Sequence, residues 1–404
     1  MTRAFARLQV SSAFANFADG MSLVAFPLLA AAFTSSPLAI GAISAARTLP
    51  WLLASVHVGA LIDRKGAARL LFGSDAARGA IFLALAVLVL FPADRFLVCL
   101  GVVAFVVGVL EVVADNSAQT LLPSIVAPEQ LPRANARIQL IENAGLNLLG
   151  APVASALMTV SLAAPFVAIA TKYSLAAATI RGLAGRAGRA TPEADVGGVL
   201  AGWLHIRRSR ALFTLAMSTS LMNIALGGAP AIMVLYVDQQ LHAPSWTYGL
   251  LLTVLALGTV LGALVVPQAL ARTSETFMLR FALVAMPLPM VVLAMATEYW
   301  LAALAMFGWG ALEIAWGIVA VSYRQEVVPY ELLGRVNAVY RMMAWGSVPI
   351  GALLTGVLGE FIGIAGAYFS LTAVLCAGWL VSLTIRPEVL DVERQLVTTQ
   401  GEAG

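Results

Sequence analysis

The sequence predicts an all-α membrane protein in which twelve transmembrane helices form two pseudosymmetric bundles of six. Composition is the first observation: the chain is 60% hydrophobic and only 11% charged, whereas soluble domains are about half apolar and about a quarter charged. The second is the length of the apolar runs, about 20 residues each, twice the length of a barrel strand. The third is a pair of motifs that recur about half a chain apart.

Glycine, proline or charged residues separate the apolar runs, and each run is long enough to cross about 30 Å of hydrocarbon. The first run continues past Asp19, so we interpret it as a membrane helix and not as a cleaved signal peptide. The expected spans are 11–33, 38–61, 70–91, 96–118, 137–158, 163–182, 212–236, 247–270, 277–296, 299–321, 337–359 and 363–385.

The distribution of arginine and lysine predicts the orientation, because these residues concentrate in cytoplasmic loops. With the N-terminus inside, the expected outside loops hold Arg95 alone, and most other basic residues fall in the inside segments. An even number of spans then places both termini in the cytoplasm. The expected location is the cytoplasmic (inner) membrane of a bacterium.

Two pairs of similar segments indicate an internal duplication. GALIDRKGAAR from Gly59 resembles GALVVPQALAR from Gly262, and PEQLPRANA from Pro128 resembles PYELLGRVNA from Pro329. The two pairs are separated by nearly the same number of residues, which favours two related halves. We expect an N-terminal bundle over 1–182, a cytoplasmic linker over 183–210 with a short surface helix, a C-terminal bundle over 211–386 and a cytoplasmic tail over 387–404.

The segment GALIDRKG resembles the signature that follows the second helix in the major facilitator superfamily of transporters. Further segments, ADGMSLVAFPLL, LPWLL, SDAARGA and ADNSAQTLLPSIVAPEQLPRANARIQ, resemble the bacterial drug and siderophore exporters of this superfamily, including the enterobactin exporter and macrolide efflux relatives. The resemblance covers nearly the whole chain. The residues that match the signature are Gly59, Leu61, Asp63, Arg64, Gly66 and Arg69.

The resemblance implies a secondary active transporter that exports small lipophilic or amphiphilic compounds, such as drugs or a siderophore, by proton-coupled antiport with alternating access. The alternative is an importer, symporter or facilitator of a small metabolite. An enzyme is not expected, because no nucleophile–base pair, metal cluster or phosphate-binding loop is visible. We expect no cofactor and no nucleic-acid partner. We expect a monomer whose partners are a small-molecule substrate, protons and the lipid bilayer.

A cytoplasmic latch is the predicted role of the signature. Asp63 would face the N-terminal end of a helix from the other half, where free N–H groups attract a carboxylate, and Arg64 or Arg69 would hold it. The alternative is a turn stabilised by local pairs without a gating role. Asp75 and Arg78 are expected in the turn beneath the bundle with Asp63 and Arg64, and Glu111 and Asp115 are expected to join that network; the alternative for these four is purely structural pairing. The predicted gating residues are Gly59, Asp63, Arg64, Gly66, Arg69, Asp75, Arg78, Glu111, Asp115, Arg133 and Arg335.

Asp19 is the first candidate for a proton-linked carboxylate, because it lies in mid-span and ionisable residues inside the membrane are costly. Arg47 is expected at a similar depth as its partner. The alternative is a static Asp19–Arg47 ion pair that fixes helix packing. The predicted proton-coupling set is completed by Glu142 and Glu313.

Glu313 shares one helix face with two tryptophans, at spacings of four and three residues. Aromatic rings around a carboxylate suit a lipophilic cation. The alternative is that the tryptophans pack or face lipid while Glu313 pairs with a basic group. No role is predicted for Lys172 in the sixth span. The predicted cavity residues are Asn16, Gln139, Asn143, Asn147, Asn223, Trp309 and Trp316.

Overall fold

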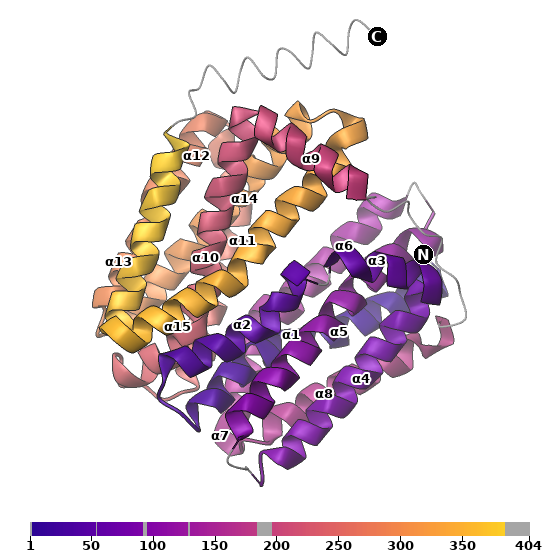
Figure 1. The fold of residues 1–404 in the computed structure, drawn as a ribbon, viewed down its shortest axis with the longest axis vertical. Helices are drawn as coiled ribbons and strands as arrows, with labels where there is room; N and C mark the ends of the chain where they lie inside the picture. Colours follow the sequence, from indigo (N-terminus) through magenta and orange to yellow (C-terminus); the bar gives the residue numbers. More distant parts are fainter. Residues whose placement is uncertain (1, 54, 92–94, 128–129, 184–195, 384–404) are drawn as a thin grey trace, which may run out of the picture. The chain divides into compact units, whose positions relative to one another are not determined.

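The computed structural model describes residues 2–53, 55–91, 95–127, 130–183 and 196–383, and all secondary structure in these ranges is helical (Figure 1). The first half contains the helices that occupy the first six expected spans. They are α1 (Arg3–Ala31), α2 (Pro37–Leu53), α3 (Ser55–Lys65), α4 (Ala67–Leu88), α5 (Phe96–Ile125), α6 (Leu131–Asn143), the π-helical turn η2 (Ala144–Leu149), α7 (Gly150–Val160), α8 (Ala164–Ile180) and the short 3-10 turn η3 (Arg181–Leu183).

The second half repeats this plan after a helix in the predicted linker. Its helices are α9 (Val196–Arg208), α10 (Arg210–Gln239), α11 (Thr247–Leu270), α12 (Glu275–Ala285), α13 (Pro287–Met295), α14 (Tyr299–Val327) and α15 (Tyr330–Ser382). Helix α15 has non-helical backbone at Gly363, with φ 77° and ψ 170°. That break falls at the expected start of the last span, so α15 supplies two spans.

Nine helical stretches of the described residues are long and apolar enough to cross a membrane, and one of them, Leu332–Ser382, has the length of two spans. The shorter apolar helix α2 and helix α8 supply the remaining two. Each expected span therefore has a helix, and the predicted all-α fold with twelve membrane spans is confirmed. The orientation in the membrane and the domain boundaries at 182, 210 and 386 stay predictions.

Local chemistry sets several helix ends. The hydroxyl of Thr2 accepts a hydrogen bond from the Phe5 N–H and caps α1, and Ser274 caps α12 in the same way through Phe277. Gly66 has φ 84°, in the left-handed region that glycine tolerates, and it separates α3 from α4. This conformation lets the chain turn sharply between the two helices.

The described residues divide into two compact units by their internal contacts. The first unit comprises Met1–Glu193 with Ala231–Thr253, and the second comprises Ala194–Pro230 with Val254–Gly404. In the first unit α8 packs along α1 and α4, while α2 packs along α5 (Figure 1). In the second unit α13 packs against α14 and α15, and α9 lies against α15.

Small residues bring the helices of each unit close together, as is common in membrane proteins. A Cβ added at Gly108 of α5 would overlap the carbonyl oxygen of Arg47 in α2. In the second unit, Gly310 of α14 lies in the same way against the Leu255 carbonyl of α11. These contacts fix the helices that carry the buried charges and the cavity described next.

Candidate transport site

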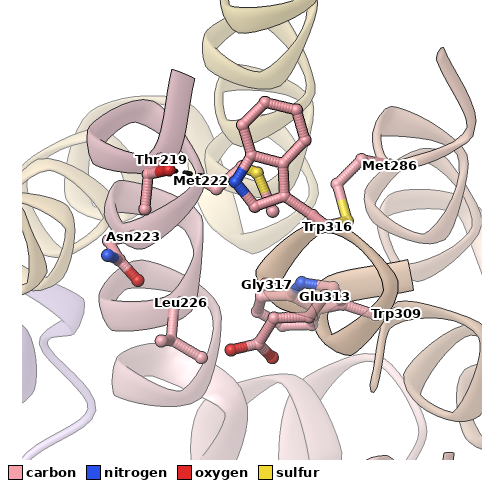
Figure 2. Close-up of a pocket in the computed structure, with 9 residues that line it drawn as sticks. All are labelled: Thr219, Met222, Asn223, Leu226, Met286, Trp309, Glu313, Trp316 and Gly317. Carbon is pink, nitrogen blue, oxygen red and sulfur yellow. Dashed lines mark hydrogen bonds between the residues drawn. The ribbon is translucent and has the colours of Figure 1, made fainter. Parts of the chain in front are cut away.

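The second unit contains a cavity of about 120 Å³ between α10 and α14 (Figure 2). Helix α14 contributes a carboxylate and two indole rings to the cavity wall. Met286, which precedes α13, also lines the cavity. The residues that line it are Thr219, Met222, Asn223, Leu226, Met286, Trp309, Glu313, Trp316 and Gly317. Three of the predicted cavity residues, Asn223, Trp309 and Trp316, line it together with Glu313 from the predicted proton-coupling set.

The two tryptophans point into the second unit and not towards lipid. Trp309 is 1% exposed and Trp316 is 3% exposed. Glu313 lies between them on the helix, and Figure 2 shows its carboxylate directed into the space next to Leu226. Glu313 forms no ion pair with a basic side chain of the described residues, and the buried ion pairs of Arg47 and Arg78 lie in the first unit.

A chain of polar contacts holds the wall of this cavity. The indole N–H of Trp316 donates to the hydroxyl oxygen of Thr219 at 2.9 Å (Figure 2). The same oxygen is hydrogen-bonded to the hydroxyl of Tyr340 in α15, while the Thr219 hydroxyl donates to the Leu215 carbonyl. The indole therefore has a fixed orientation across the cavity.

The contacts continue from Tyr340 towards the repeated motif at the start of α15. The guanidinium of Arg324 lies 4.0 Å from the centre of the Tyr340 ring, a favourable cation–π geometry. Its Nε donates to the Asn337 side-chain oxygen at 2.6 Å. Asn337 belongs to the segment PYELLGRVNA, so Arg324 and Tyr340 connect the repeated motif to Thr219 in the cavity wall.

The first unit contains a buried ionic triad. Arg78 of α4 donates through Nη1 to Asp19 of α1 at 2.9 Å and through Nη2 to Asp75 at 2.6 Å. The hydroxyl of Tyr173 in α8 also donates to Asp19, at 2.6 Å. The Arg78 guanidinium lies 4.2 Å from the centre of the Tyr173 ring. Three helices are thereby joined at one charged centre.

A second buried ion pair links α2 to α5. Arg47 donates through Nη2 to the Glu111 carboxylate at 2.8 Å and to the Ser22 hydroxyl at 3.0 Å. The expected Asp19–Arg47 pair is therefore wrong. Arg47 is turned towards α5, which approaches α2 closely at Gly108, whereas Asp19 faces α4 and α8.

The expected position of Asp75, Arg78 and Glu111 in the turn beneath the bundle is also wrong. Helix α4 begins at Ala67, so Arg78 lies about three turns inside it. All three side chains are buried among α1, α2, α4, α5 and α8. Asp115, one turn beyond Glu111, is half-buried.

The remaining predicted gating residues lie near helix ends or outside the described part. The side chain of Asp63 lies outside the described part, and so does that of the predicted cavity residue Asn147. Gly59 is half-buried in α3. The arginines of this set are exposed: Arg64, Arg69, Arg133 and Arg335.

The other predicted cavity residues belong to the first unit and do not line the cavity of the second. The amide of Asn16 donates to the Ser12 carbonyl, and that of Asn143 donates to the Gln139 carbonyl. The Gln139 amide and the Glu142 carboxylate are 3.5 Å apart. The polar side chains at 139, 142 and 143 of the fifth span thus make contacts within their own helix.

Lys172 has a structural partner that the sequence did not indicate. Its ammonium lies 5.3 Å from the centre of the Phe17 ring and 5.5 Å from that of Phe14. Cation–π contacts with the faces of two α1 rings stabilise a cation that would otherwise be costly in mid-span. The hydroxyls of Tyr173, Thr219 and Tyr340 were likewise missed, because their partners are far away in the sequence.

A multi-pass helical chain with buried ionisable networks and a small cavity has the architecture of a secondary membrane transporter. The chain belongs to the major facilitator superfamily, in the family described as transmembrane secretion effector, whose model matches residues 1–400. It is a transporter and not an enzyme. Among the described residues, no group of His, Cys, Asp and Glu side chains has the geometry to hold a metal ion.

One curated relative is the multidrug efflux pump Tap of Mycolicibacterium fortuitum, which is 26% identical over 380 residues, covering 89% of this chain and 90% of Tap. Solved structures share the fold. A bacterial homologue of the iron transporter ferroportin, in an inward-facing state, matches with a TM-score of 0.74 and 15% identity over 95% of this chain and 98% of its own. A peptide transporter variant in complex with sulfate matches with a TM-score of 0.76 and 13% identity over 96% and 95%.

Proposed function

We propose that this protein is a proton-driven exporter of small lipophilic or amphiphilic molecules that carry a positive charge. The observation that carries the proposal is the Glu313 carboxylate, which lines an aromatic cavity without a basic partner among the described residues. The similarity to a multidrug efflux pump supports export. We place the protein in the bacterial cytoplasmic membrane.

The physical argument begins with the cost of a carboxylate in a low-dielectric cavity. A charge removed from water needs a neutralising partner, and here a proton or an organic cation can supply it. The indoles of Trp309 and Trp316 add attraction for a cation, together with apolar surface for its body. Substrate and proton therefore compete for Glu313, which is the requirement for exchange of one against the other.

The first unit supplies further proton-linked groups. Asp19 is joined to Arg78 and Tyr173, so a change in the proton occupancy of this cluster alters the contacts between α1, α4 and α8. Arg47 holds Glu111 and thereby ties α2 to α5. Glu142 remains the candidate on the fifth span. In this proposal proton occupancy of the first unit and of Glu313 sets which conformation is favoured.

Transport into proteoliposomes tests the proposal with ethidium, a permanently charged aromatic cation, as the probe. With the membrane potential clamped, vesicles with an acidic lumen are expected to accumulate ethidium, because outward proton flow drives antiport. Glu313→Gln is expected to lower the initial rate at low ethidium concentration by about tenfold or more, since a charged interaction contributes about 1.5–3 kcal/mol.

Glu298→Gln is the matched control, because Glu298 precedes the same helix but is exposed and outside the cavity. It is expected to transport like the parent protein. Accumulation driven by an acidic exterior would indicate symport and would contradict the proposed export. Equal rates for Glu313→Gln and the parent would remove Glu313 from the substrate site.

A further inference from the structure

The triad of Asp19, Arg78 and Asp75 has an imbalance of charge. It contains two carboxylates and one guanidinium, and the side chains are 5%, 1% and 0% exposed respectively. If both acids were ionised, one surplus negative charge would be sealed inside the first unit. Such a charge is costly in a low-dielectric interior unless a partner or a proton neutralises it.

The hydrogen bonds distinguish the two carboxylates. Asp19 accepts two donors at Oδ1, one from Arg78 and one from the Tyr173 hydroxyl. Asp75 accepts one donor at Oδ1, and its Oδ2 is buried without a hydrogen-bond partner. The ionised form of Asp19 is thus the better stabilised of the two, and the unsatisfied oxygen belongs to Asp75.

The other cations on the helices packed around Asp75 have partners elsewhere. The titratable groups that face the triad are Tyr173 from α8 and Glu111 and Asp115 from α5. Arg47 pairs with Glu111 and Ser22, and the Lys172 ammonium of α8 lies over the Phe14 and Phe17 rings of α1. The exposed charges at the neighbouring helix ends are Arg64 and Lys65 of α3, Arg69 of α4 and Arg181 of η3. The two α5 acids add negative charge, so they increase the need for a proton.

We propose that Oδ2 of Asp75 is a proton-binding site, and that Asp19 is the fixed anion that holds Arg78 in place. A proton on Oδ2 removes the surplus charge while Oδ1 continues to accept from Arg78. Release of that proton requires water to reach Oδ2, and therefore requires α4 to move relative to α1 and α8. The proton is thereby linked to conformation. This inference rests on the proposed proton coupling and names the group that carries it.

Asp75→Asn tests the site because asparagine has the shape of the protonated acid and cannot release a proton. The full-length protein in proteoliposomes is assayed in two ways: ethidium accumulation driven by an acidic lumen, and ethidium counterflow without a pH gradient. In Asp75→Asn the stimulation by the gradient is expected to disappear, while counterflow stays within about twofold of the parent because binding and conformational exchange persist. Asp238→Asn, an exposed aspartate in α10, is the control and is expected to keep both activities.

The outcomes separate this inference from the proposed function. Full gradient stimulation in Asp75→Asn would overturn the Asp75 site, and so would loss of stimulation in Asp115→Asn instead. Absence of gradient stimulation in the parent protein would defeat the proposed proton coupling, whatever the variants do.

A second measurement covers the case in which Asp75→Asn does not fold. Infrared spectroscopy of the parent protein at neutral pH is expected to show the C=O stretch of a protonated carboxylic acid that is protected from exchange with solvent. In Asp75→Glu, which keeps an acid at this position, that band is expected to shift. A band that is absent from the parent, or unmoved in Asp75→Glu, contradicts the site.

Discussion

At the scale of single residues, Thr219 determines how the cavity presents its aromatic wall. Its hydroxyl oxygen accepts a hydrogen bond from the Trp316 indole and is also hydrogen-bonded to the Tyr340 hydroxyl. The orientations of both aromatic side chains therefore depend on this one hydroxyl. Because an indole that is free to rotate offers a cation a less defined ring face, the orientation of Trp316 matters for binding in the proposed site.

Replacement of this hydroxyl gives a residue-scale prediction. Thr219→Val keeps the shape of the side chain but removes the acceptor, and we expect the kcat/KM of ethidium transport to fall about threefold to tenfold, the equivalent of one hydrogen bond. Thr219→Ser restores the acceptor and is expected to stay within about twofold of the parent. If the two variants behave alike, the hydroxyl has no role in binding.

The sequence could indicate which residues are buried and charged but not how they pair. Asp19 and Arg47 lie at similar depth by residue counting, which made their pairing a reasonable hypothesis. Depth is fixed by rise along a helix, whereas the partner depends on the rotation of each helix about its own axis. That rotation is set by contacts such as Gly108 against the Arg47 carbonyl, which join segments far apart in the chain.

At the scale of helices, close approach through small residues gives the second unit its form. Gly310 lies one residue after Trp309 and packs against the Leu255 carbonyl of α11. Gly308, in the same helix, has open space where a Cβ would be. An alanine at each glycine therefore distinguishes two effects on stability: loss of close helix packing at position 310 and gain of helix propensity at position 308.

We expect opposite effects at these two positions. Gly310→Ala forces α11 and α14 apart and should lower the free energy of unfolding by about 1–3 kcal/mol, the usual cost of overpacking. Gly308→Ala should be neutral or stabilising by up to about 1 kcal/mol, because alanine favours a helix. Thermal unfolding of both variants in detergent measures the difference. A destabilised Gly308→Ala together with an unaffected Gly310→Ala would contradict the packing described for α14.

The helices themselves were largely predictable, because run length and breaking residues act locally. Gly363 interrupts α15 where the last span was expected to start, and the fifth span contains the irregular turn η2. The short gap between α12 and α13 was not expected. Pro287 and Pro289 explain it, since proline lacks the N–H that continues a helix.

At the scale of the whole molecule, the two duplicated halves differ in their electrostatics. The buried ion pairs of Arg47 and Arg78 belong to the first unit, whereas the second presents Glu313 to a cavity. The partner of the repeated motif differs as well: Asn337 binds the buried Arg324, whereas the residue that corresponds to Arg324 in the first half is Leu122. In the proposed mechanism the second unit binds substrate and proton in turn at Glu313, while the first unit binds a further proton at its buried charged cluster.

Equilibrium binding of ethidium to the purified protein over a series of pH values tests this account most directly. Since protons and the organic cation compete for Glu313, the affinity of the parent protein is expected to fall as the pH is lowered. In Glu313→Gln the affinity should be lower by about tenfold or more. Because glutamine does not titrate, the competition between proton and ethidium at position 313 should be lost. An affinity that does not change with pH in the parent, or that is equal in parent and variant, would contradict the central claim.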